Sequence, residues 1–212
     1  YMYPFNKLKL KKDASKRQFL KKEQFEAIGS FKLKENTKAC IYRDMFIFSI
    51  FAGGLRFSDV LEIQHKHLNE EERRIKKVIR KTGRMHQFKI GQLALDIIHK
   101  YKNEKTTPDD FIFPVVTNKE LFFSNEEFRY TFSESINKAA NFQIKRIATK
   151  LEIKTNVSFH ISRHTFATNA LNNGMRIEHV SKLMDHNDIS TTQIYAKIIN
   201  EELDNAVDKY IH

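Results

Sequence analysis

The sequence predicts a mainly α-helical (α+β) domain with a small antiparallel β-sheet of about three strands at one edge. Apolar residues recur at helical spacing over most of the 212-residue chain. Only residues 74–79 and 87–90 are short β-branched or alternating segments, and a Lys-Thr-Gly-Arg turn at 81–84 separates them. Since 41% of the residues are hydrophobic, the chain can bury one well-packed core.

Residues 1–17 mix Lys with scattered apolar residues and show no firm period, so we expect a linker or arm that enters a domain spanning residues 18–212. A short helix is expected near Ser58, which can cap it, after Gly53 and Gly54 have closed the preceding helix. Longer helices are expected at residues 21–31, 37–51, 92–101, 125–151 (one helix or two), 160–171, 177–184, 191–199 and 201–210.

Composition restricts the partners and the compartment. Lys and Arg total 37 against 26 Asp and Glu, a net charge of +11, which favours a polyanion such as nucleic acid without proving one. Cys40 is the only cysteine, which excludes an intramolecular disulfide and a cysteine-rich zinc site, and its neighbours predict a buried residue. No apolar run approaches the ~20 residues that span a bilayer, so we expect a cytoplasmic protein without a membrane partner.

Two segments carry residues suited to phosphate chemistry. His160 and Arg163 are three positions apart near the start of an expected helix, where free N–H groups and a guanidinium can bind an anion. Farther along, Tyr195 follows His186 by nine positions, and a tyrosine hydroxyl can attack a phosphodiester if nearby groups neutralise the phosphate. Taken singly, each residue is better explained by a capped helix, a solvated charge or core packing.

Together, these segments resemble the C-terminal boxes of the tyrosine recombinase (phage-type integrase) family, and the sequence is similar to integrases of Bacteroides-type mobile elements. Residues 160–168 read His-Ile-Ser-Arg-His-Thr-Phe-Ala-Thr, and residues 183–195 end in Thr-Thr-Gln-Ile-Tyr. Residues 52–60 resemble the first arginine box of the family, and the turn at 81–84 resembles its lysine turn. The family's N-terminal core-binding domain is expected to be absent from this chain.

The resemblance implies the fold of a tyrosine recombinase catalytic domain and site-specific DNA recombination through a 3′-phosphotyrosyl intermediate. It implies double-stranded DNA as the partner, a homotetramer on DNA, a monomer when free, and no metal, ATP or other cofactor. The positions that match the family's catalytic residues are Arg56, Lys81, His160, Arg163, His186 and Tyr195.

The resemblance also implies a role for each matched position. The two arginines would bind the non-bridging oxygens of the scissile phosphate, and Tyr195 would be the nucleophile. Lys81 would protonate the departing 5′ oxygen, while His160 would accept the tyrosine proton and His186 would donate a hydrogen bond to the phosphate.

Two features of the sequence leave alternatives open. Asp185 stands where the family usually has glycine, and its carboxylate either weakens anion binding or points outward. DNA-phosphate contacts are expected from three residues of the long helix, although a solvated basic face explains them equally well. These residues are Lys145, Arg146 and Lys150.

Three other functions remain possible from the sequence. A DNA-binding protein that has kept the fold and lost catalysis is the main alternative to a recombinase. A type IB topoisomerase would share the fold and the chemistry but would relax DNA with little choice of site. A metal-dependent hydrolase could use some of the 9 His residues, but no His-Glu-x-x-His spacing occurs.

Overall fold

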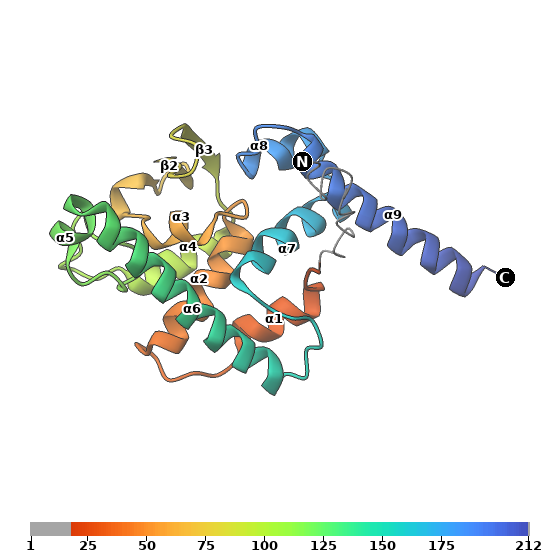
Figure 1. Cartoon of the computed structure of the whole chain (residues 1–212), viewed down its shortest axis with the longest axis horizontal. Helices are drawn as coiled ribbons and strands as arrows, with labels where there is room; N and C mark the ends of the chain where they lie inside the picture. Colours follow the sequence, from red (N-terminus) through yellow and green to blue (C-terminus); the bar gives the residue numbers. More distant parts are fainter. Residues whose placement is uncertain (1–17, 212) are drawn as a thin grey trace, which may run out of the picture.

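The computed structural model describes residues 18–211 of the chain, so the expected arm at residues 1–17 lies outside the described residues. The described part is mainly helical with one three-stranded antiparallel sheet, as the sequence predicts. Figure 1 shows the helices gathered around α2, with the sheet at one side and α9 projecting away from the rest. The α-helices are α1 (Lys22–Ser30), α2 (Lys38–Phe51), α3 (Phe57–Leu61), α4 (Gln92–Tyr101), α5 (Lys119–Ser124), α6 (Glu126–Lys150), α7 (Phe159–Asn172), α8 (Ile177–Leu183) and α9 (Ser190–Tyr210).

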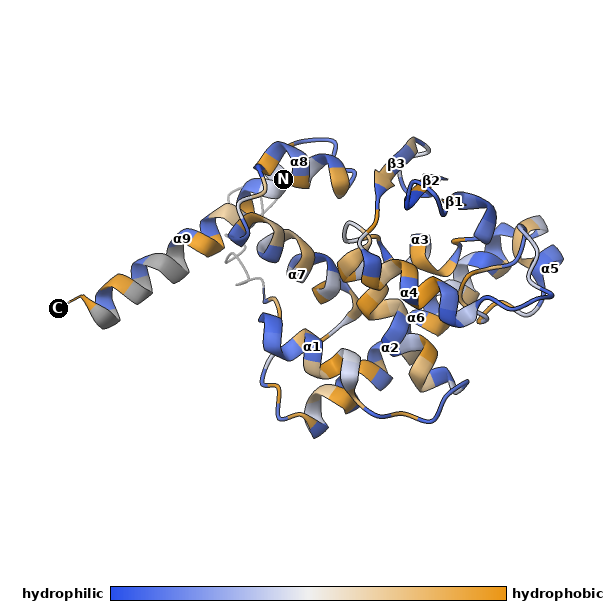
Figure 2. Cartoon of the chain, turned by 180° about the vertical axis from the view of Figure 1, so that it is seen from behind, coloured by the Kyte–Doolittle hydropathy of each residue, from blue (hydrophilic) through white to orange (hydrophobic). Residues whose placement is uncertain are grey.

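Helix α2 is the centre of the core. Its N-terminus is capped by Thr37, whose hydroxyl accepts the backbone N–H of Cys40. The helix is apolar on almost every side, and Cys40 is buried as expected. Helices α1, α4, α6 and α7 all pack against α2. Figure 2 shows hydrophobic residues concentrated where these helices meet.

The sheet has the order β1 (Leu68–Asn69), β2 (Arg74–Val78) and β3 (Met85–Lys89). In the β2–β3 hairpin, Ile75 pairs with Phe88 and Lys77 pairs with His86. These pairs face the protein, and the alternate positions face solvent. The hairpin therefore presents its turn, residues 79–84, at the edge of the helical body.

Two expectations about the elements need correction. Ser58 does not cap α3: Arg56 occupies the N-cap position, and no side chain caps that helix end. The tail forms one helix, α9, instead of two, since nothing in Ile199-Asn200-Glu201 interrupts the helical backbone. For residues 125–151 the sequence left one helix or two open, and the structure has one, α6, whose N-cap Asn125 accepts the N–H of Phe128.

The fold predicts a pH dependence of stability through His67, beside β1. Burial and the nearby Lys77 and Lys66 lower the pKa of His67 to about 4, and its Nδ1 accepts the N–H of Gln64. Because the unfolded residue protonates below about 6.5, the unfolded state binds more protons between these pKa values, and this contribution to stability falls as pH drops from 6.5 to 4. The urea midpoint should therefore fall less between pH 7 and pH 4.5 in His67→Gln than in the wild type.

A second variant shows whether removing any histidine changes the pH dependence of the urea midpoint. His179→Gln replaces an exposed histidine on α8 and should leave the wild-type fall in midpoint intact. An undiminished fall in His67→Gln would contradict the assignment.

Candidate active site

Four of the six residues singled out from the sequence line one cavity of about 610 Å³. Arg56 lies at the start of α3, Lys81 in the β2–β3 turn, and His160 and Arg163 on the first turns of α7. These elements lie far apart in the sequence, and packing of α3 and α7 against α2 brings them together. The cavity thus presents four cationic side chains, because Arg80 also lines it, and an exposed imidazole, which suits a phosphodiester.

Arg163 is the most constrained of these side chains, since only 5% of it is exposed. Its Nη1 donates to the Gly54 carbonyl at 2.6 Å, and its Nη2 donates to the Met184 carbonyl. Burial and the charge of Arg56 lower the pKa of Arg163 to about 10, so it stays protonated at neutral pH. These two carbonyls fix the guanidinium, which is therefore preorganised for an anion.

Gly54 makes that arrangement possible and carries a stability prediction. Its φ is +68°, and a Cβ at this position would lie 2.9 Å from Cδ1 of Phe166. Gly54→Ala should destabilise the fold by roughly 2–3 kcal/mol, because it combines a left-handed backbone with a steric clash. Denaturant unfolding measures this loss.

The control for this prediction is Gly174→Ala. Gly174 also has a positive φ, +82°, but a Cβ there would meet no atom within 4 Å. Gly174→Ala should therefore lower the unfolding free energy by only about 1 kcal/mol, the cost of placing alanine in a left-handed backbone. Equal losses in the two variants would show that the contact with Phe166 is unimportant.

Tyr195 lies in the first half of α9, and only 2% of it is exposed. Its ring packs in a small second cluster with Ala167, Val180 and Met184. Its hydroxyl and Nδ1 of His164 are 2.9 Å apart, within hydrogen-bond distance. Among the described residues, Tyr195 packs beside the cavity that Arg163 lines but is not part of the lining.

His164 is a site residue that the sequence analysis did not single out. Its ring stands edge-on to that of His160, with 4.4 Å between the ring centroids. The two imidazoles thus extend from the cavity, where His160 lies, to the hydroxyl of Tyr195. The signal was present in the sequence, because His164 follows His160 by one helical turn and directly follows Arg163.

His186 lies in the loop between α8 and α9, outside the lining of this cavity as far as the described residues show. Its Nδ1 is 2.8 Å from the hydroxyl of Thr192, in the first turn of α9. Because Arg163 holds the Met184 carbonyl two residues earlier, this loop is anchored to the cavity wall.

Asp185, next to His186, points inward, toward the hairpin. Its backbone is left-handed, with φ of +51°. Its carboxylate accepts a hydrogen bond from the Thr82 hydroxyl at 2.7 Å and pairs with Arg84 at 3.1 Å. A second cation, Arg56, lies 3.9 Å away. The carboxylate thus stands between the hairpin turn and the cavity arginine.

Asp59 is a second acidic residue at this site, and unlike Asp185 it was not singled out from the sequence. It is buried three positions after Arg56, and its Oδ1 accepts the backbone N–H of Arg80 at 3.2 Å. Lys77 lies 3.8 Å from the same oxygen. Asp59 therefore fixes the base of the turn that carries Lys81.

Helix α6 supplies the opposite wall of the cavity. Asn141 connects this wall to α7, because its Oδ1 accepts the N–H of Phe159 at 2.6 Å and its amide donates to Asn137 at 3.2 Å. The wall residues are Tyr130, Ser133, Glu134, Asn137 and Asn141.

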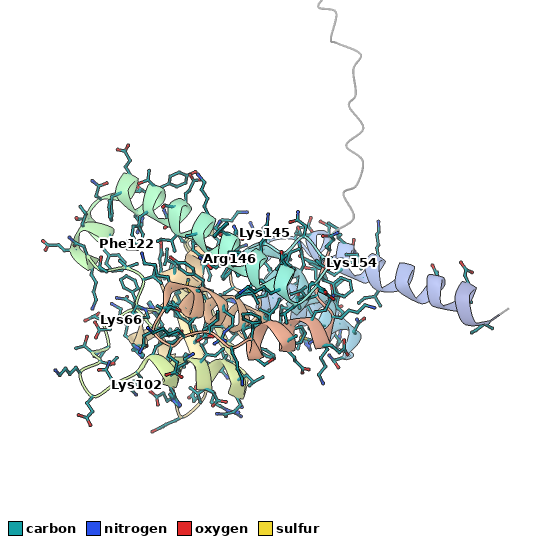
Figure 3. All side chains as sticks on the ribbon, turned by 90° about the horizontal axis from the view of Figure 1, so that it is seen from below. Lys66, Lys102, Phe122, Lys145, Arg146 and Lys154 are labelled. Carbon is teal, nitrogen blue, oxygen red and sulfur yellow. The ribbon has the colours of Figure 1, made fainter. Side chains whose placement is uncertain are left out.

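The basic residues expected to contact DNA lie beyond this wall. Lys145, Arg146 and Lys150 are exposed on the C-terminal half of α6, where Figure 3 labels the first two, and the cavity lining within the described residues does not include them. Arg146 lies over the ring of Phe142, and Lys150 lies over the ring of Phe31. Their expected contacts with DNA phosphates stay a prediction.

The helical body with its edge hairpin has the fold of tyrosine recombinase catalytic domains. The chain belongs to the Phage integrase family, which matches residues 18–202. This confirms the resemblance to the tyrosine recombinase (phage-type integrase) family, while the similarity to Bacteroides-type elements stays a prediction.

Individual relatives agree with the family assignment. The chain is 29% identical over 160 residues to tyrosine recombinase XerD of Pseudomonas aeruginosa, covering 73% of this chain and 49% of that protein. The solved structure of XerA recombinase has a TM-score of 0.61 at 18% identity, covering 91% of this chain and 65% of that one. The solved structure of a XerH recombinase bound to a palindromic difH substrate has a TM-score of 0.59 at 19% identity, covering 92% of this chain and 53% of that one. The chain thus spans about half the length of XerD.

In the described part of the chain, no helix is long and apolar enough to cross a membrane. Within residues 18–211 we also find no group of three or more His, Cys, Asp and Glu side chains placed to hold a metal ion.

Proposed function

We propose that this chain is the catalytic domain of a site-specific DNA recombinase that cleaves and rejoins DNA through a 3′-phosphotyrosyl intermediate. The observation that carries the proposal is the meeting of Arg56, Lys81 and Arg163 in one cavity, next to the helix that bears Tyr195. The family membership and the relatives named as tyrosine recombinases support the same activity.

Cleavage of the phosphodiester needs no reactant other than the protein and the DNA. The Tyr195 oxygen attacks the phosphorus, and the bond from phosphorus to the 5′ oxygen breaks. The tyrosine proton passes to a histidine: His160 matches the family's position, and His164 is the imidazole at the hydroxyl. Lys81 protonates the departing 5′ oxygen, and a flexible ammonium on an exposed turn suits this role.

The arginines stabilise the charge of the transition state. Arg163 is held by two backbone carbonyls, so its guanidinium needs little reorganisation when a phosphate arrives. Because the new phosphotyrosyl ester conserves the energy of the broken bond, a second 5′-hydroxyl can reverse the reaction and join a different strand. His186 would donate a hydrogen bond to the phosphate.

The partner is double-stranded DNA, and the net charge of +11 favours it. The XerH structure, described as a post-cleavage complex with its substrate, supports this choice. We also propose a homotetramer on DNA, a monomer when free, and a cytoplasmic location. Phosphate contacts from Lys145, Arg146 and Lys150 belong to the same proposal.

The test uses a pool of nicked duplexes with randomised arms, designed so that the cleaved end diffuses away. With chelator present and ATP omitted, a fraction of the pool should become attached to the chain and resist denaturant. Mass spectrometry should find the nucleotide on the peptide that contains Tyr195. Enrichment of a sequence without any adduct would favour the inactive DNA-binding protein, and attachment at another residue would refute the assigned nucleophile.

A further inference from the structure

We propose that Asp185 is a positioning residue that clamps the turn carrying Lys81 against the loop carrying His186. The role in catalysis rests on the proposed function, whereas the clamp itself is a property of the DNA-free chain. The family's usual glycine could make none of these side-chain contacts.

Both carboxylate oxygens of Asp185 are used by the turn. Oδ2 accepts the Thr82 hydroxyl at 2.7 Å, and Oδ1 pairs with Arg84 at 3.1 Å. Arg84 also donates to Asn187, so one turn residue contacts both sides of His186 in the loop. Only 11% of the Asp185 side chain is exposed, which strengthens these bonds relative to a surface pair.

Beyond Ile79, which is buried in the core, the turn has little apolar packing to hold it. The last strand pair, Val78 and Met85, is 48% and 57% exposed. Lys81 is exposed, and a Cβ at Gly83 would meet nothing within 4 Å. A hairpin tip with so few contacts opens locally at low free energy, so polar bonds decide its position. Asp59 fixes the start of the turn through Arg80, and Asp185 fixes its middle and end.

The backbone at Asp185 supports a specific role. A φ of +51° is comfortable for glycine and unfavourable for a residue with a Cβ, although aspartate tolerates it better than most. The chain keeps a carboxylate there, and the contacts with Thr82 and Arg84 compensate for the strain.

The clamp also reaches the phosphate-binding group. Arg56 lies 3.9 Å from the Asp185 carboxylate, so the same side chain that holds the turn adjoins the cavity arginine. Asp185 therefore sets the distance between Lys81, the proton donor, and Arg56, which binds the phosphate. Its effect on cleavage should appear at the step that Lys81 performs.

Hydrogen exchange of the DNA-free chain tests the clamp directly. In Asp185→Gly, which keeps the backbone conformation, the amides of residues 80–84 should exchange about tenfold faster than in the wild type. Thr82→Val should show the same change, and Thr82→Ser, which keeps the hydroxyl, should not. Asp96→Asn removes an exposed negative charge on α4 and should leave the turn unchanged. Unchanged exchange in Asp185→Gly would overturn the clamp.

Cleavage of two substrates tests the role in proton donation. A duplex with sulfur in place of the bridging 5′ oxygen releases a thiolate, which needs no proton because a thiol has a pKa of about 8.5. Asp185→Gly should cleave the normal duplex about tenfold more slowly than the wild type and the sulfur duplex at the wild-type rate. Equal slowing of both duplexes would indicate a merely structural role and would refute the positioning role.

The two experiments separate the two proposals. If the wild type cleaves neither duplex, the proposed function fails, and hydrogen exchange still decides whether Asp185 holds the turn. If the wild type cleaves both and Asp185→Gly matches it on both, the positioning role fails while the proposed function stands.

Discussion

Tyr195→Phe is expected to abolish covalent attachment to DNA while leaving the fold intact. The substitution removes only the hydroxyl, and the ring can still pack against Ala167, Val180 and Met184. Loss of a nucleophile from a catalytic group that acts as a unit lowers the rate by about 10⁶-fold, which is below detection in an adduct assay. Loss of the hydrogen bond with His164 should cost about 1 kcal/mol of stability.

The measurement is the adduct yield on a denaturing gel, together with DNA binding in a gel shift. Binding should persist in Tyr195→Phe, because the cationic cavity is unchanged. Tyr42→Phe is the matched control, since Tyr42 is also 2% exposed but lies on α2, away from the cavity. Adduct formation by Tyr195→Phe would mean that another residue is the nucleophile.

Arg163→Lys should have the second largest effect. An ammonium cannot reproduce the planar fork that donates to the carbonyls of Gly54 and Met184 and still face the cavity. We expect cleavage to slow by about 10³-fold, as when a preorganised donor to a transition state is lost. The unfolding free energy should fall by about 1–3 kcal/mol, because a buried carbonyl loses its donor.

Single-turnover cleavage and urea unfolding measure these two effects separately. Arg176→Lys is the control, since the Arg176 side chain is 73% exposed and forms a surface ion pair with Glu178. It should change stability by no more than about 0.5 kcal/mol and leave cleavage unaffected. Cleavage by Arg163→Lys within tenfold of the wild type would show that the fixed guanidinium is dispensable.

The sequence predicted the helices whose apolar pattern is long and uninterrupted. Residues 92–101 were predicted at the bounds of α4, and α2 was recognisable from its dense apolar residues. Helix α5 was missed because six residues are too few to show a period, and the two-residue strand β1 has no pattern of its own. The cap of α3 was misplaced because Arg56 is not a typical N-cap residue.

The sequence was enough to predict which residues belong to the site, because short motifs identify them. It was not enough to predict which way a side chain points when the backbone of a loop decides that direction. Arg56, Lys81, His160 and Arg163 were named from motifs, and the structure brings them to one cavity. The inward direction of Asp185 depends on a left-handed backbone that no pattern encodes. In the same way, the contact between His164 and Tyr195 joins α7 to α9 and follows only from their packing.

The side chain of Asn141 has a consequence for redesign of DNA preference. It accepts the N–H of Phe159 at the start of the helix that carries Arg163, and its amide donates to Asn137 on the same α6 wall of the cavity. The α6 wall, which a library would diversify, and helix α7, which carries the Arg163 guanidinium, therefore both depend on the side-chain amide of Asn141. Libraries that randomise Tyr130, Glu134 and Asn137 but keep Asn141 should retain many folded clones. Libraries that also randomise Asn141 should lose folded clones before any preference for DNA can be selected.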